Sequence, residues 1–147
     1  MLTIRKLSID DYDEIYTLWM STPGMGLNDI DDSKIGIEKY LNRNPNTCFV
    51  AEMGGRITGV ILSGHDGRRG YIHHTAVSIE NRNKGIGSTL VDSALKALSD
   101  EGISKVALVV FERNEIGNTF WEYKGFLARE DLIYRNMALS EIKRIDT

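Results

Sequence analysis

Two glycines and two basic residues lie between an extended-looking segment, residues 71–79, and a helical pattern. The stretch is RNKGIGS, residues 82–88. The first N–H groups of a helix have no partner inside the helix, and glycines leave such groups uncovered. With the positive end of the helix dipole and two cations beside them, these groups attract phosphate. The stretch therefore predicts a diphosphate site, and the alternative is that the glycines only make a sharp connection.

Two known phosphate-binding motifs fit this stretch poorly. A dinucleotide fingerprint requires a third glycine where the chain has Leu90, and it normally lies in the first βαβ unit. A P-loop requires Gly-Lys-Ser/Thr after a four-residue gap, which the stretch lacks. Nucleotide binding is therefore the less favoured interpretation of the glycines.

Hydrophobic periodicity indicates the elements that must position this site. Residues 2–7 alternate as a short strand, and Ser8 with Asp11 resembles a capping box that opens a helix. A second helix is expected roughly from Ser33 to Leu41, with Asp32 or Ser33 as its cap. The segments TCFVAEM, GG and RITGVILSG predict a hairpin, and YIHHTAVSI follows as a third antiparallel strand.

The second half of the chain alternates helix and strand. The helix after the glycines ends at Gly102, a natural C-cap. Residues 103–111, ISKVALVVF, are apolar enough for a strand buried on both faces. NEIGNTFWEYK predicts a helix ended by Gly125, and residues 126–139 supply the last strand or two. The predicted order is β-α-α-β-β-β-α-β-α-β, a mixed, mostly antiparallel sheet flanked by helices: α/β in the broad sense, α+β by strict connectivity.

Size and composition are typical of one globular domain, expected to span residues 1–147. The chain has 147 residues, a net charge of -3 and one cysteine. This charge gives no general basic field for nucleic acid, and a lone Cys48 excludes an intramolecular disulfide and a zinc cluster of several thiolates. No apolar run approaches transmembrane length, and the N-terminus turns polar too early for a signal peptide. We expect a cytoplasmic protein without a metal.

Two motifs together resemble the GCN5-related N-acetyltransferase (GNAT) superfamily. Residues 82–87 match its Arg/Gln-x-x-Gly-x-Gly/Ala signature, and NEIGNTFWEYKGF resembles its Asn-rich helix ending in aromatic-aromatic-Glu-x-x-Gly-Phe. The resemblance extends to the element order of the whole chain. It implies an N-acetyltransferase that moves an acetyl group from acetyl-coenzyme A to a primary amine: a protein N-terminus, a lysine or a small amine. A non-catalytic acyl-coenzyme A-binding sensor is the alternative from another class.

The resemblance also implies how the cofactor is held. Residues 82–88 would bind the diphosphate, and the third strand of the meander would pair with the pantetheine arm. That strand and residues 103–111 would splay apart around the thioester. The residues implied to bind coenzyme A are Ala76, Val77, Arg82, Asn83, Lys84, Gly85, Ile86, Gly87, Ser88, Asn114, Asn118 and Trp121. A helix N-cap is the alternative for Asn114, and core packing is the alternative for Trp121.

An amine acceptor must lose a proton, because an alkyl ammonium titrates near about 10.4. Strand alternation places His73 on one face with Val77, and His74 on the other with Ala76. His73 matches a position at which some family members carry a histidine, and imidazole titrates near about 6.5. His73 is therefore the candidate base, against the alternative of an ordinary strand histidine, and His74 is the weaker candidate.

The general acid and the acceptor site are less clearly indicated. Trp121 stands where the family usually has a tyrosine that protonates the departing thiolate, and Tyr134 is a substitute candidate. A thiol titrates near about 8.5, so water would also serve. The connection between the first two helices carries three acids, including Asp32, that could attract a cationic amine; a solvated, helix-capping loop is the alternative. We expect acetyl-coenzyme A and an amine as partners, no nucleic acid and no membrane, and leave a homodimer open.

Overall fold

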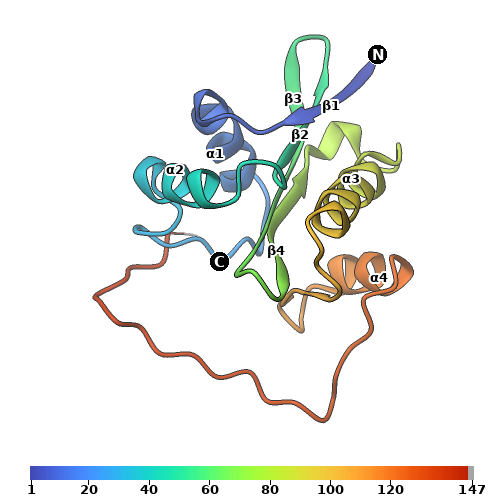
Figure 1. The fold of residues 1–147 in the computed structure, drawn as a ribbon. Coiled ribbons are helices and arrows are strands. Elements are labelled where there is room, and N and C mark those ends of the chain that lie inside the picture. The colour runs from blue at the N-terminus through green and yellow to red at the C-terminus, as the bar shows by residue number, and fades with distance from the viewer. Residues whose placement is uncertain (146–147) are drawn as a thin grey trace.

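A five-stranded sheet with helices on both faces forms the body of the protein (Figure 1). The computed structural model describes residues 1–145. The strands, in sheet order, are β1 (Leu2–Lys6), β2 (Phe49–Met53), β3 (Arg56–His65), β4 (Gly70–Val77) and β5 (Val106–Ala107). The first three pairings are antiparallel and β4 pairs with β5 in parallel, which confirms the predicted meander and the mixed sheet.

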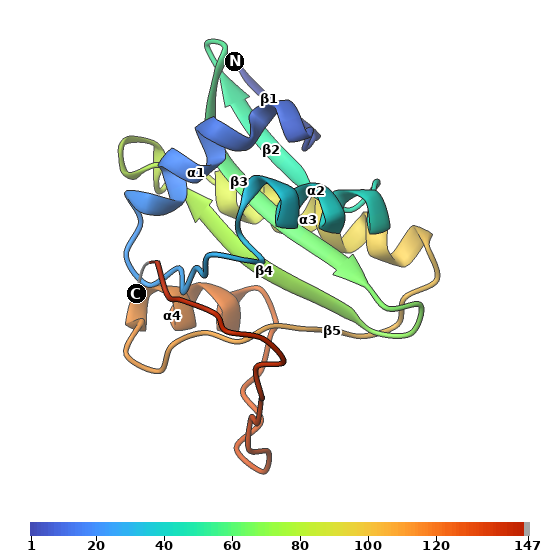
Figure 2. The ribbon, with the colours of Figure 1, turned by 90° about the vertical axis from the view of Figure 1, so that its left-hand side faces the viewer.

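The helices form one layer on each face of this sheet (Figures 1 and 2). They are α1 (Tyr12–Met20), α2 (Lys34–Arg43), α3 (Ile86–Asp100) and α4 (Glu115–Tyr123), with short 3-10 helices at Ile9–Asp11 and Ile79–Asn81. One layer holds α1 and α2, and the other holds α3 and α4. In the part of the chain that the structure describes, none of the helices has the length and hydropathy needed to span a membrane.

Local capping chemistry explains where the N-terminal helices begin. Ser8 and Asp11 form the predicted capping box, in which the Ser8 N–H donates to the Asp11 carboxylate at 2.9 Å. The hydroxyl of Ser33 accepts the Gly36 N–H at 3.0 Å, so Ser33 caps α2. Asp32 therefore does not cap this helix, and its carboxylate is used elsewhere.

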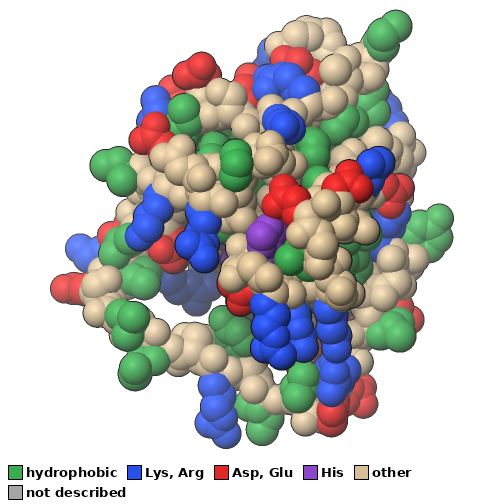
Figure 3. Space-filling view, viewed as in Figure 1, with side chains coloured by type: hydrophobic (Ala, Val, Ile, Leu, Met, Phe, Trp, Pro, Cys, Tyr) green, Lys and Arg blue, Asp and Glu red, His purple; other side chains and the backbone are tan. Residues whose placement is uncertain are grey.

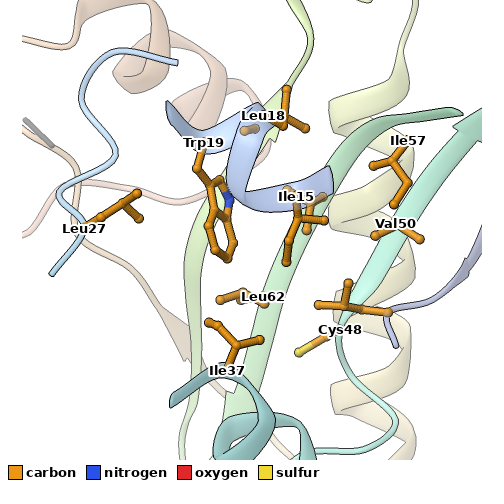
Figure 4. Packing of buried hydrophobic residues seen from close by; sticks show 12 residues of the cluster. Ile15, Leu18, Trp19, Leu27, Ile37, Cys48, Val50, Ile57 and Leu62 are labelled. Atoms are coloured by element: carbon orange, nitrogen blue, oxygen red, sulfur yellow. The ribbon is translucent and has the colours of Figure 1, made fainter. Parts of the chain in front are cut away.

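Two hydrophobic clusters fix the sheet between its helix layers. Between the sheet and α1/α2, Ile15, Trp19 and Ile37 are fully buried against strand residues such as Val50 (Figure 4). The second cluster joins the other face to α3 and α4 through a row that includes Leu90. Full burial of each such side chain stabilises the fold by about 1.5–3 kcal/mol. The sheet therefore holds the first turn of α3 in a fixed place beside β4.

The strands β4 and β5 separate after two residue pairs. Gly70 pairs with Val106 and Tyr71 with Ala107, and no further pairs join them. This confirms the predicted splay, and it leaves the β5-facing edge of β4 open from residue 72 to residue 77. The prediction of a long strand over residues 103–111, buried on both faces, is wrong. No strand lies on the outer side of this segment within residues 1–145, and Val109 is 58% exposed there.

The predicted final strand is absent from residues 126–139. The segment runs away from the sheet between two anchors: Phe126 packs on the second cluster, and the Ile145 N–H donates to the Leu27 carbonyl at 3.1 Å (Figure 2). Hydrophobic side chains stand exposed along it (Figure 3), namely Leu127, Leu132, Ile133, Tyr134, Met137 and Leu139. A strand requires a partner for its ladder, and β5 offers only a two-residue template.

A β-bulge interrupts the alternation of side chains in β4. Val60 pairs with Ala76 and Leu62 with His73, so two residues of β4 oppose a single residue of β3. His74 lies in the bulge with a φ of +36°. His73 contacts Tyr40 of α2 and His74 contacts Trp19 of α1, so both rings face the α1/α2 layer. The predicted opposition of the two histidines is therefore wrong.

The same bulge separates His73 from Val77. Val77 packs on the cluster of α3 and α4, on the other face of the sheet from the His73 ring. The prediction that these two side chains share a face is wrong, because the extra residue shifts the phase of the alternation by one.

Candidate functional site

The N-terminus of α3 presents a row of backbone N–H groups that have no partner among residues 1–145. The first hydrogen bond of the helix runs from the Thr89 N–H to the Gly85 carbonyl at 3.0 Å, and no side chain caps the helix. Within residues 1–145, the N–H groups of residues 83–88 have no hydrogen-bond partner. Asn83 and Gly85 have φ values of +62° and +80°, and left-handed residues of this kind occur in the backbone nests that bind anions. This geometry suits an anion with several oxygens.

Cationic side chains surround these donors. The Arg82 Nε donates to the Val77 carbonyl at 3.1 Å, and Lys84 is exposed beside it. A third cation, Lys124, extends from the end of α4: its Nζ lies 2.8 Å from the Ser88 Oγ and 2.7 Å from Asp92. Sequence reasoning missed Lys124, because the contact joins residues 36 positions apart and no local pattern marks it.

The two glycines of the motif have different tasks. A Cβ at Gly87 would make ordinary van der Waals contact with Phe120 at 3.4 Å and Val77 at 3.6 Å, which leaves little room for a larger side chain between α3, α4 and β4. A Cβ at Gly85 would meet no atom within 4 Å, and the left-handed φ explains glycine there. Substitution of Gly85 therefore probes the anion site, whereas a valine at position 87 would also disturb packing.

The open edge of β4 leads directly to the N-terminus of α3. Ala76 and Val77 lie on the stretch of β4 that has lost its β5 neighbour, five to six residues before Arg82. Ala76 is buried under α1/α2 and Val77 packs toward α3, so their side chains anchor the strand from both faces. An extended ligand could thus pair with the edge of β4 while its phosphates meet α3.

The predicted α4 residues all have structural tasks within the chain. The Asn114 side chain accepts the Gly117 N–H at 2.9 Å and caps α4. The amide of Asn118 donates to the Asn114 carbonyl at 2.8 Å and to the Phe111 carbonyl at 3.1 Å. The Trp121 ring packs at about 5 Å against two phenylalanines of the second cluster. Coenzyme A contact by these three residues stays a prediction.

His73 lies against aromatic rings. Its ring centroid is 4.5 Å from that of Tyr71 and 5.7 Å from that of Tyr40. Burial, with a smaller effect of the neighbouring His74, lowers the pKa of His73 to about 4. The ring is therefore neutral at pH 7, but its lone pair has a low proton affinity. A general base is most effective when its pKa lies near the working pH, so these surroundings do not favour His73 as the base.

Tyr134 lies on the exposed C-terminal segment. Its side chain is 67% exposed, yet it is close enough to Tyr71 to add to the effect of burial, which raises the pKa of the Tyr71 phenol. Tyr134 thus stands near the start of the splay, and its role as general acid stays a prediction. Tyr123 is 81% exposed on α4.

His74 forms a short hydrogen bond with Asp32. The Nε2 of His74 lies 2.7 Å from Oδ1 of Asp32, and their side chains are 16% and 5% exposed. The other carboxylate oxygen accepts the Asn28 N–H at 2.9 Å, and the Tyr12 hydroxyl donates to the Asp32 carbonyl. The contact joins the α1–α2 connection to the bulge of β4. Of the three acids predicted to attract an amine, Asp32 is thus bound to a histidine.

A surface hollow lies beside the N-terminus of α4. Its volume is about 510 Å³, and it lies between the α1–α2 connection, represented by Pro23 and Gly24, and the segment between β5 and α4. A Cβ at Gly26 would lie 3.5 Å from the Phe111 ring, and the Arg113 guanidinium lies 4.4 Å from the centroid of that ring. The loop predicted to cover the acceptor site therefore borders this open surface hollow.

Comparison with known proteins identifies the class of enzyme. The sequence model of the acetyltransferase (GNAT) family matches residues 12–126, so the chain belongs to this family and is an acyltransferase. An acetyltransferase of Photorhabdus laumondii is 34% identical over 118 residues, which is 78% of each chain. An acetyltransferase of Sodalis glossinidius is 29% identical over 140 residues, or 95% of this chain and 97% of its own.

Solved structures agree on the fold. Ard1 of Thermoplasma volcanium superposes with a TM-score of 0.76 at 23% identity, covering 86% of this chain and 82% of its own. The PaiA N-acetyltransferase of Thermoplasma acidophilum, solved in complex with coenzyme A, gives a TM-score of 0.73 at 20% identity, covering 88% of this chain and 91% of its own. These similarities confirm the GNAT fold that the two motifs predict.

Proposed function

We propose that the protein, as one domain over its whole length, transfers the acetyl group of acetyl-coenzyme A to a primary amine by direct attack on the thioester. The observation that carries the proposal is the row of N–H groups at residues 83–88, unpartnered within residues 1–145 and placed at the end of the open β4 edge. Coenzyme A has a diphosphate for the former and an amide-containing arm for the latter. The complex of the PaiA relative with coenzyme A supports this choice of cofactor.

Each step of the proposed reaction is assigned to residues of this chain. The N–H groups and the cations of residues 82–88 hold the diphosphate, and the edge of β4 at Ala76 and Val77 pairs with the arm. A backbone N–H near Val77 stabilises the tetrahedral oxyanion, and α4 closes the site through Phe120. The amine enters through the hollow beside Pro23 and Phe111. A thiolate is a fair leaving group, so Tyr134 or water suffices as the acid.

An acceptor screen with detection of free thiol tests this proposal. Acetyl-coenzyme A is offered with peptides bearing free N-termini, peptides with lysine but blocked N-termini, and small amines. The proposal expects thiol release that depends on one of these amine classes. Tight binding of acetyl-coenzyme A without thiol release over the entire panel would instead indicate a non-catalytic sensor.

The protein's own thiol is expected not to react with the thiol reagent of that assay. Cys48 is the one cysteine of the chain and is 2% exposed, and burial raises the pKa of its thiol to about 12. Because the thiolate is the reactive form, the native protein should react with a disulfide reagent at least about a hundredfold more slowly than the unfolded protein. Mass spectrometry after timed labelling measures this, and rapid labelling of the native protein would show that Cys48 is accessible.

A further inference from the structure

We infer that His74, oriented by Asp32, is the base that deprotonates the acceptor amine, an inference that rests on the proposed function. Neither residue is defined by the glycine motif or by the α4 motif. Their pairing appears only in the folded chain, where 42 positions of sequence separate them.

The pair has the arrangement of a base held by a carboxylate. The short contact between Nε2 and Asp32 fixes that nitrogen as the donor, so the lone pair of the neutral ring lies on Nδ1. Within residues 1–145, Nδ1 has no hydrogen-bond partner, and the side chain keeps 16% of its surface exposed. A base within hydrogen-bond reach of an orienting group is the recurrent pattern of activated sites.

The surrounding structure holds His74 in a costly conformation. A φ of +36° is strained for a residue that carries a Cβ, and it persists only where neighbouring contacts impose it. Trp19 supplies one such contact: its indole N–H donates to the His74 carbonyl at 3.0 Å and its ring meets the imidazole edge-on at 5.3 Å. The bulge thus turns His74 toward Asp32 instead of the face that regular alternation would give it.

The position of the pair fits the path of the acceptor. His74 lies two residues before Ala76, on the stretch of β4 that has separated from β5. Asp32 belongs to the α1–α2 connection, whose earlier part, Pro23 and Gly24, borders the hollow. A group on this stretch can meet an amine that arrives from the α1/α2 side while a thioester occupies the splay.

The proposed proton transfer balances as follows. The ammonium form of the acceptor gives one proton to Nδ1 of His74, and Asp32 stabilises the imidazolium. The neutral amine attacks the thioester carbonyl, so that the C–N bond forms and the C–S bond breaks, and the thiolate leaves with the electron pair of the C–S bond. The second proton of the nitrogen passes through water to the thiolate. His74 then returns its proton to solvent.

Several other titratable groups lie near His74 and Asp32, and each of them could contribute to the pH dependence of the rate. His73 is the neighbour on β4, with ring centroids 6.1 Å apart. Tyr12 approaches from α1, and Asp31 lies beside Asp32 in the connection. The test must therefore compare single variants.

The experiment measures kcat and KM between pH 5 and pH 9, with an amine found in the acceptor screen, for three histidine variants. His74→Asn keeps a residue that tolerates a positive φ but removes the base. It is expected to lower kcat by about 10²–10⁴-fold and to remove the rise of the rate with pH, while coenzyme A affinity stays within about twofold. His65→Gln is the matched control and should retain kcat, because His65 pairs with Glu101 on the surface.

Asp32→Asn separates a positioning role from a purely structural one. Without the carboxylate that orients the imidazole, kcat should fall about tenfold or more, with KM for acetyl-coenzyme A unchanged. This variant decides the case if His74→Asn does not fold. Full kcat in His74→Asn, full kcat in Asp32→Asn, or loss of the pH-dependent rise in His73→Gln alone would each overturn the inference. Absence of coenzyme A binding in the wild-type protein would instead reject the proposed function.

Discussion

Gly85→Asp is expected to weaken coenzyme A binding by about a hundredfold, about 2.7 kcal/mol, whereas Gly85→Asn is expected to stay within a few-fold of the wild-type affinity. The aspartate places a negative charge at the N-terminus of α3, where the diphosphate is proposed to bind. Two unit charges about 4 Å apart repel by about 1 kcal/mol in water and about 4 kcal/mol near a protein surface. Isothermal titration with coenzyme A measures the difference.

The comparison of aspartate with asparagine isolates charge from shape. Both side chains tolerate the left-handed φ of Gly85, and a Cβ there meets no atom within 4 Å. Both variants should therefore lose a similar, small free energy of unfolding, on the order of 1 kcal/mol. The gap between their affinities should narrow as salt rises, because screening weakens surface repulsion. Equal affinities for both variants at low salt would refute the anion site.

The free energy of unfolding is expected to fall by about 3 kcal/mol between pH 6.5 and pH 4 because of His73 alone. Burial lowers the pKa of this residue in the folded protein to about 4, whereas an unfolded histidine titrates near about 6.5. Between these values the unfolded chain binds a proton that the folded chain does not. Stability from this group is therefore present above pH 6.5 and is lost as the pH falls toward 4.

Urea unfolding of the wild-type protein and of His73→Gln, at several pH values, measures this contribution. Between pH 4 and pH 6.5, the free energy of unfolding should change with pH less steeply in the variant than in the wild-type protein, by about 1.4 kcal/mol per pH unit. Asp11, whose pKa is lowered by its contact with Arg5 and the Ser8 N–H despite burial, adds its own loss only as the pH falls below 3.8. Parallel stability curves for the two proteins above pH 4 would show that His73 is solvated in solution.

Local chemistry made the uncapped start of α3, the proposed anion site, predictable from sequence. Glycine at positions 85 and 87 and the basic residues beside them are adjacent in the chain, and their effect depends on one helix terminus. The capping box at Ser8 and the Gly-Gly hairpin were predictable for the same reason. Even there the sequence did not show that the two glycines have different surroundings, because the contact of Phe120 with Gly87 arises from the packing of α4.

The bulge at His74 was not predictable, because its causes lie far away in the chain. The indole that binds its carbonyl comes from Trp19, 55 positions earlier, and Asp32 lies 42 positions earlier. Strand alternation assumes regular pairing, and one extra residue reverses the face of each side chain before it. The prediction of a strand at residues 126–139 was wrong for a related reason. The composition of the segment is typical of a strand, but a strand also needs the edge of another strand to pair with.

The most direct test of the central claim follows the backbone N–H groups themselves by ¹H–¹⁵N NMR during titration with coenzyme A. The amide signals of residues 83–88 should move on addition of coenzyme A and stay in place with pantetheine, which lacks the diphosphate. Signals of β4 near Ala76 should respond to both ligands. Saturable binding of coenzyme A with unmoved amides at residues 83–88 would contradict the account.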